Sequence, residues 1–336
     1  MKNRLKDFIF IIAFPLVTFL IMDTIVNVSK GHHMIRSMLD VVNIIRTGGI
    51  SAILAFALSF NLSSGRFDLS LGAQRLAGTI IGGTIALNLG LSGIWLMLFA
   101  IIFGAIFGLL TGLIFVTLRV PPMVLGIGMG LIWEVFPYVF TSGKGLILFG
   151  KPGVQILSNT YFIVGTVVIV GVIMTLLMNK TKFGYELRAI QGSQVVAQNS
   201  GIDIFKHTVL CYTFAGALVC VAGVISTAYA TNLSSSLGLA SSGAVAANMF
   251  PMILGGYLGR RSNDSIGTIV AAITIRIFAY GLAQMEFSEA NASVFSQVVF
   301  VGFLIFLANE AVFKKRKAEK DRIAEAVAYK KEAGIA

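Results

Sequence analysis

The chain of 336 residues is 56% hydrophobic and only 12% charged, with a mean hydropathy of +0.87. This composition excludes an ordinary soluble domain and indicates a polytopic membrane protein. The formal net charge of +11 does not indicate a nucleic-acid partner, because the Lys and Arg residues lie between apolar segments and near the C-terminus, where they are typical of topology signals.

Apolar segments recur along almost the whole sequence, and crossing a hydrocarbon core of about 30 Å requires about 20 residues. Long apolar segments favour helices over a β-barrel, since lipid cannot satisfy a free backbone. We therefore expect an all-α membrane protein with about ten transmembrane helices, of which the second, third and eighth are candidates for interruption. The expected spans are 8–28, 41–62, 67–89, 94–118, 123–141, 161–178, 207–230, 244–258, 266–285 and 294–312.

The first span resembles a signal peptide because it follows a basic N-terminus. It is longer than a signal peptide, contains Pro15 and lacks a small-residue cleavage site, so we expect it to remain. With the N-terminus in the cytoplasm, the connectors that then face inward carry most of the Lys and Arg residues. Both termini are therefore expected in the cytoplasm, with one transmembrane domain over 1–312 and a charged tail over 313–336.

The longest polar interruption between two apolar segments is 179–203, which this topology places in the cytoplasm. Gly192 is expected to end one short helix, Ser193 to cap a second and Gly201 to stop it. Apolar side chains on a connector of this kind indicate a surface that receives a partner. These side chains are Phe183, Tyr185, Leu187, Val195 and Val196.

A short internal repeat relates two parts of the chain. Asn61-Leu62-Ser63-Ser64 leads to Gly82-Gly83, and Asn232-Leu233-Ser234-Ser235 leads to Gly255-Gly256. These segments fall between the second and third spans and between the seventh and eighth, on opposite sides of the membrane. The repeat therefore predicts two five-helix halves of inverted orientation.

Polar residues at membrane depth are expensive and are expected to face the protein interior or a water-filled path. Asp23, Arg46 and Arg66 are expected near span ends, where their side chains can reach water. The ionisable residues Asp68, Arg75, Glu134 and Arg276 are expected deeper in the membrane, where each is equally consistent with a structural ion pair. The side chains expected along a translocation path are Asn61, Asp68, Ser70, Arg75, Glu134, Asn248 and Arg276.

The motifs of several other functions are missing from the sequence. Gly143-Lys144-Gly145 lacks the rest of a P-loop, no constellation of His, Asp or Ser predicts catalysis, and no set of residues has metal-ligand spacing. Cys211 and Cys220 share one span and are expected to be free thiols. The charged residues at membrane depth are few and scattered, which argues against ion coupling and favours a transport path driven by another protein. An ion-coupled secondary transporter of a small polar solute is the alternative.

Three motifs resemble the permease subunits of bacterial ABC importers of the ribose and autoinducer-2 type, which are related to branched-chain amino acid permeases. Arg66-Phe67-Asp68-Leu69-Ser70-Leu71-Gly72 is similar to Gly-Ile-Asp-Leu-Ser-Val-Gly of that family, and Val120-Pro121-Pro122-Met123 to its Val-Pro-Pro-Phe. The most specific match is cytoplasmic, from Thr181 to Gln191 and then from Ala197 to Ile202. The resemblance covers roughly 51–309.

The resemblance implies a non-enzymatic permease in the bacterial cytoplasmic (inner) membrane, with no cofactor bound by this chain. ATP and Mg²⁺ would bind a partner ABC ATPase. A periplasmic or lipid-anchored binding protein would deliver a sugar or sugar-like solute, and a like or unlike second permease would complete the pore. The outer surface of the permease would contact membrane lipid. The residues implied to couple to the ATPase are Thr181, Phe183, Gly184, Arg188, Ala197, Ser200 and Gly201.

The sequence departs from the family pattern at several positions. Arg66 stands where the family commonly has Gly, Glu134-Val135 where it has Arg-Gly, and Val245-Ala246-Ala247 where it has Glu-Leu-Asp. These departures argue against a standard pentose as the solute and are compatible with a pair of unlike permeases.

Overall fold

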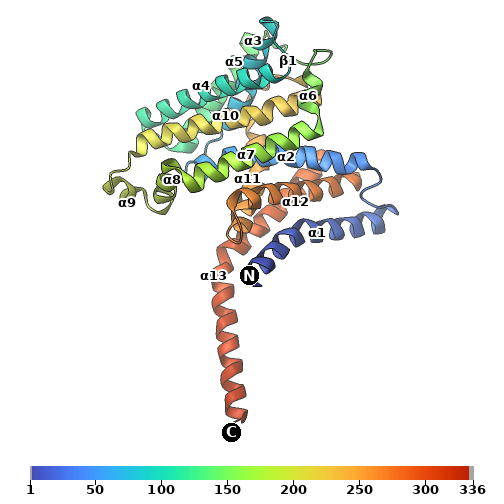
Figure 1. Ribbon diagram of the computed structural model, residues 1–336, viewed down its shortest axis with the longest axis vertical. Helices are drawn as coiled ribbons and strands as arrows, with labels where there is room; N and C mark the ends of the chain where they lie inside the picture. The colour runs from blue at the N-terminus through green and yellow to red at the C-terminus, as the bar shows by residue number, and fades with distance from the viewer. Residues whose placement is uncertain (1, 333–336) are drawn as a thin grey trace. The chain divides into compact units, whose positions relative to one another are not determined.

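The computed structural model describes residues 2–332, which are almost entirely helical (Figure 1). The helices are α1 (Lys2–Lys30), α2 (Met38–Leu62), α3 (Leu71–Asn88), α4 (Ile94–Leu118), α5 (Pro122–Phe140), α6 (Val154–Ser158), α7 (Thr160–Lys180), α8 (Lys182–Gly192), α9 (Gln194–Asn199), α10 (Ile204–Ala230), α11 (Ser242–Gly259), α12 (Asp264–Gln284) and α13 (Glu289–Glu332). The two strands are β1 (Leu146–Ile147) and β2 (Asn232–Leu233).

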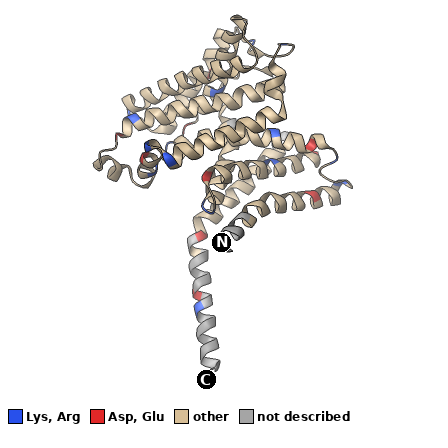
Figure 2. Cartoon of the chain, viewed as in Figure 1, with Lys and Arg blue, Asp and Glu red and all other residues tan. Residues whose placement is uncertain are grey.

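Each of the ten predicted spans coincides with one of these helices, which confirms the predicted fold class. Eight helices of the described chain are long and apolar enough to cross a membrane: α1, α2, α4, α5, α7, α10, α12 and α13. The other two, α3 and α11, have 18 residues each. In Figure 2 the long helices are mostly free of charged residues, as membrane-spanning helices are expected to be.

The structure differs from the predicted elements in three places. Helices α2, α3 and α11 each run without interruption, although α11 contains Pro251. Helix α3 begins at Leu71 rather than at position 67, because Asp68 and Ser70 form a turn that precedes the helix. The short helix α6 and the antiparallel β1–β2 pair were not predicted; the pair joins the segment after α5 to the segment after α10.

Contacts divide the chain into two units, Met1–Met285 and Glu286–Ala336. The first unit holds α1 to α12. The second holds α13, a helix of 44 residues that runs through the predicted boundary between the membrane domain and the charged tail. The predicted tail extends to 336, and its last four residues lie outside the described part.

Two parts of the first unit are built alike. Helix α3 packs on α4, and α11 packs on α12; α4 packs along α10, and α12 packs along α2. Helices α2 and α10 are antiparallel. Asn43 Oδ1, near the start of α2, lies 3.1 Å from the Tyr229 hydroxyl at the end of α10, whereas Phe60, near the end of α2, meets Phe214 in the first half of α10 with ring centroids 5.9 Å apart. The predicted inverted relationship is therefore present between α2–α4 and α10–α12.

Small residues allow α4 and α10 to approach closely. A Cβ atom added at Gly104 would overlap the carbonyl oxygen of Gly216, and one added at Gly108 would overlap that of Tyr212. Because lipid provides no hydrophobic drive for helix association, close packing of this kind holds such helices together. The glycine ladder of α4 thus serves packing within the chain.

Candidate functional site

The first helical turns of α3 and α11 meet inside the first unit. A Cβ atom added at Gly72 would overlap the carbonyl oxygen of Ser241, which directly precedes α11. Each of these two helices follows one copy of the Asn-Leu-Ser-Ser repeat, and each begins ten residues after the Asn of that repeat. The repeat therefore brings two helix N-termini together, an arrangement typical of solute sites in transporters with discontinuous helices.

Asp68 holds the start of α3. The carboxylate is 4% exposed, and its Oδ1 accepts hydrogen bonds from the backbone N–H of Ser70 at 2.8 Å and from the Ser70 hydroxyl at 2.6 Å. Gln74 Nε2 donates to Ser70 Oγ at 2.8 Å and so extends the same network. A carboxylate at a helix N-terminus is stabilised by unpaired N–H groups and by the helix dipole.

Glu134 of α5 serves the start of α11 in a comparable way. Its side chain is fully buried, and its two carboxylate oxygens accept from the backbone N–H groups of Leu239 at 2.7 Å and Ser241 at 2.8 Å. These charge-assisted bonds fix the segment that leads into α11. Asp68 and Glu134 were predicted to line a path or to form ion pairs; the structure places both at the entrances of α3 and α11, with N–H and O–H donors as partners.

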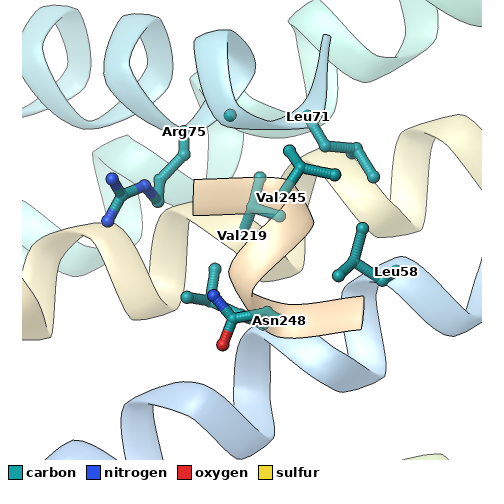
Figure 3. A pocket seen from close by; sticks show the side chains of 8 residues that line it. Leu58, Leu71, Arg75, Val219, Val245 and Asn248 are labelled. Carbon is teal, nitrogen blue, oxygen red and sulfur yellow. The ribbon is translucent and has the colours of Figure 1, made fainter. Parts of the chain in front are cut away.

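Arg75 and Asn248 line one narrow cavity between α3 and α11. In Figure 3 both lie on one side of the cavity, and Leu58, Leu71 and Val245 lie on the other. Asn248 is 3% exposed, and its Oδ1 accepts a hydrogen bond of 2.7 Å from the Ser51 hydroxyl of α2. Two residues predicted for the path, from opposite halves of the sequence, thus share one cavity.

A second cavity adjoins the first towards the end of the unit where α8 and α9 lie. Asn61, Arg66 and Asp68 contribute its polar lining, and Leu58, Leu71 and Val245 line both cavities. These three apolar side chains, each at most 5% exposed, therefore form a layer between the two cavities. We call them the apolar layer.

Arg66 also lines an open groove formed with the end of α4 and the starts of α5, α9 and α10. It therefore stands between the second cavity and the surface of the unit. The prediction that Arg66 reaches water from a span end is wrong: the residue is 4% exposed, because the connector after α2 folds inward against α10. The signal that sequence analysis did not use is its place in the motif, two residues before Asp68.

Arg276 of α12 lines neither of the two cavities. It is partly buried, and its Nε atom has no hydrogen-bond partner within the described chain. The structure thus gathers Asn61 and Asp68 around one cavity and Arg75 with Asn248 around the next. Ser70 lines neither cavity but is hydrogen-bonded to Asp68, and Glu134 and Arg276 also line neither.

The connector between α7 and α10 folds into the two predicted short helices. Thr181 caps α8, since its hydroxyl accepts from the Gly184 N–H at 3.4 Å, and Ser193 caps α9 by accepting from the Val196 N–H at 3.4 Å. Gly201 follows α9 with φ of 82°, a left-handed conformation that favours glycine. The predicted cap at Ser193 and stop at Gly201 are confirmed, and the cap at Thr181 is an addition that the structure reveals.

Phe183 joins α8 to the long helices. Its ring stacks on His207 of α10 with 4.4 Å between centroids and an interplanar angle of 10°, and His207 Nε2 donates to the Phe183 carbonyl oxygen at 3.0 Å. The same ring meets Phe214 of α10 edge-on at 5.3 Å and Phe60 of α2 at 6.1 Å. We call Phe60, Phe183, His207 and Phe214 the aromatic cluster.

Helix α9 contacts the connector that carries Arg66. Gln194 Nε2 lies 3.4 Å from the Ser64 carbonyl oxygen. The α8–α9 segment is thereby attached both to the aromatic cluster and to the chain that lines the second cavity. A movement of the α8–α9 segment would therefore displace both the aromatic cluster and the connector that carries Arg66, because it contacts each of them directly.

The outward face of α8 and α9 differs from the prediction. Phe183 is half-buried and Leu187 is 1% exposed, so these two side chains pack against their own protein. The apolar side chains that remain exposed are Tyr185, Val195 and Val196. A short helix does not reveal from its own sequence which apolar face its neighbours cover, and this explains the error.

The other predicted coupling residues fall on both sides of the segment. Gly184 and Ala197 are buried, and a Cβ at Gly184 would overlap the carbonyl oxygen of Met178. Arg188 is exposed, bonds Asn179 Oδ1 at 3.0 Å and lies over the Tyr185 ring. Ser200 and Gly201 are exposed at the end of α9.

The chain resembles proteins whose names describe permeases. It is 28% identical over 278 residues to the ribose import permease protein RbsC of Bacillus subtilis (strain 168), covering 80% of this chain and 83% of that protein. It is 26% identical over 287 residues to the L-arabinose transport system permease protein AraH of Escherichia coli (strain K12), covering 81% of each chain.

A solved structure of an ABC transporter of the metal-chelate type, in an inward-facing conformation, has a similar fold. The TM-score is 0.51 at 14% identity, and the match covers 90% of this chain and 97% of that one. Residues 41–304 match the family described as the permease component of branched-chain amino acid transport systems. Because this match covers most of the sequence and includes both cavities and the α8–α9 segment, the chain belongs to that family of multi-pass membrane permeases.

Proposed function

We propose that this chain is the transmembrane permease subunit of an ATP-driven importer and forms the path for a sugar or sugar-like polar solute. The relatives named for ribose and L-arabinose support the class of solute. Binding and hydrolysis of ATP with Mg²⁺ occur on a partner ATPase. A binding protein delivers the solute at the periplasmic side, and a second permease completes the complex in the inner membrane, with both termini in the cytoplasm.

The observation that carries this proposal is the construction of the α8–α9 segment. It presents Tyr185, Val195 and Val196 outward, with exposures of 58%, 69% and 63%. An apolar face on small polar-sequence helices suits docking into a groove of another protein. The aromatic cluster behind it gives the docked partner a rigid connection to α2 and α10.

The proposed path follows the two cavities. Solute would pass Arg75 and Asn248, then the apolar layer, then Asn61 and Arg66, and leave through the open groove. The apolar layer closes this route in the described conformation, so transport requires α2, α3 and α11 to separate there. Closure of the ATPase subunits on ATP would supply that movement through the α8–α9 segment.

The test is purification of the full chain from a mild detergent extract, followed by mass spectrometry of the proteins that remain bound. A P-loop ATPase should be recovered with the wild type and lost with Val196→Glu, because a charge there opposes apolar docking. Ser262→Glu, an exposed site in the connector between α11 and α12, is the matched control and should retain the ATPase. Recovery of the chain without any ATPase, even after crosslinking, would favour the ion-coupled transporter.

A further inference from the structure

Three arginine side chains inside the first unit have no carboxylate partner within the described chain. Arg66 is buried, and neither of its Nη atoms has a hydrogen-bond partner; the buried Nε atoms of Arg75 and Arg276 are likewise unpartnered. The side chains of α10 that interact with the Arg66 guanidinium are the Cys211 thiol and the Tyr212 hydroxyl, neither of which is an anion at neutral pH. Buried cations without a counter-charge are costly and therefore indicate an interaction that this chain does not supply.

The two carboxylates at comparable depth do not compensate these arginines. Asp68 bonds the backbone and hydroxyl of Ser70, and Glu134 bonds the N–H groups that lead into α11. Each carboxylate is thus balanced by the start of a helix. A surplus of positive charge remains along the cavities.

Two of these arginines, Arg75 and Arg66, are placed in series where a solute would pass. Arg75 lines the cavity above the apolar layer, and Arg66 lines both the cavity below it and the open groove. Both the nitrogen and the oxygen of the Asn61 side-chain amide are buried without partners beside Arg66. An amide with both groups available suits a hydroxyl, which donates and accepts.

We propose that the solute is an anionic sugar derivative, carrying a carboxylate or phosphate group that Arg75 and then Arg66 bind during passage. This inference rests on the proposed function and specifies its solute. Guanidinium groups bind carboxylate and phosphate oxygens in bidentate pairs, and such a pair would supply the missing counter-charge on each side of the apolar layer. A neutral sugar would leave both arginines unpaired throughout transport.

The buried thiols of Cys211 and Cys220 provide a reporter for the test. The full chain, with any permease that copurifies, is heated in lipid nanodiscs with a dye that fluoresces on reacting with exposed thiols. The probes are D-ribonate, D-ribose 5-phosphate and the neutral ribitol, at equal concentration and at ionic strength equalised with KCl. At least one anionic probe should raise the unfolding midpoint, whereas ribitol should leave it unchanged, because only binding to the folded state shifts the midpoint.

Variants connect the shift to the arginines. Arg75→Gln or Arg66→Gln should abolish the shift, and Arg75→Lys should retain part of it. Arg261→Gln changes an exposed arginine in the connector between α11 and α12, which lines neither cavity nor the open groove, and should retain all of the shift. The wild-type comparison of ribonate with ribitol needs no variant and remains decisive if a variant fails to fold.

Three outcomes would overturn the inference: an equal shift with ribitol, no shift with either anion, or a full shift in both folded Gln variants. A shift with ribitol would mean that the solute is neutral and would leave the importer function intact. Failure of the importer function is detected separately, by the absence of an ATPase in the purification.

Discussion

Replacing Phe183 by Ala should uncouple the ATPase from the helices while leaving the ATPase bound. The substitution removes the ring contacts with His207, Phe214 and Phe60 but leaves the outward face of α8 and α9 in place. Aromatic pairs contribute about 1 kcal/mol each, so losing the two closer contacts removes about 2 kcal/mol from the connection. A coupling free energy of that size corresponds to roughly a 30-fold effect.

The assay measures an ATP-dependent conformational change without the need to know the solute. Cys211 lies next to the aromatic cluster, with its Sγ 3.5 Å from His207 Nδ1. In the complex with its ATPase, the rate at which a maleimide alkylates Cys211 should change with ATP, and mass spectrometry separates this site from Cys220. In Phe183→Ala the ATP-dependent change should fall at least tenfold.

Tyr185→Ala is the contrasting variant, because Tyr185 is exposed on the docking face and makes no contact with the aromatic cluster rings. It should weaken ATPase binding itself. The coupling role would be refuted if Phe183→Ala released the ATPase in the same way, or if it kept the full ATP-dependent change in Cys211 alkylation.

Three further substitutions follow from the packing. Glu134→Gln weakens two charge-assisted hydrogen bonds and should lower the free energy of unfolding by about 1–3 kcal/mol, measured as a lower midpoint of thermal unfolding. Val135→Gln, on the exposed side of α5, should change the midpoint less. Gly104→Val should prevent stable folding, because the backbone of α10 occupies the space that the new side chain needs. A Cβ atom at Gly128 meets no atom within 4 Å, so Gly128→Val should fold; size-exclusion chromatography distinguishes the two variants by their monodispersity. Leu58→Ala opens the apolar layer and should raise passive leakage of ribonate from proteoliposomes severalfold; leakage equal to wild type would contradict a closing role for that layer.

Sequence patterns predicted the helices well because each pattern is local. Span lengths follow from runs of apolar residues, and the start and end of α9 follow from Ser193 and Gly201. The Asn-Leu-Ser-Ser repeat predicted that α3 and α11 are equivalent, and the two helices have the same length.

The errors concern side chains whose surroundings come from distant segments. Arg66 is buried because α10 lies against its connector, and Leu187 is buried because α8 folds back on the long helices. The role of Glu134 depends on a loop more than a hundred positions away in the sequence. Neither periodicity nor composition contains these pairings, so the fold was predictable from sequence while the partners of its polar residues were not.

The shortness of α3 and α11 has a consequence for how the protein enters the bilayer. Each helix of 18 residues is about 27 Å long, slightly less than the hydrocarbon thickness of about 30 Å, and neither passes the length and hydropathy expected of a free-standing span. Each packs against the longer helix that follows it in the chain, α4 or α12. During synthesis, α3 and α11 therefore depend on a later segment for stable insertion, and a nascent chain that stops before α4 should leave α3 accessible to reagents in water.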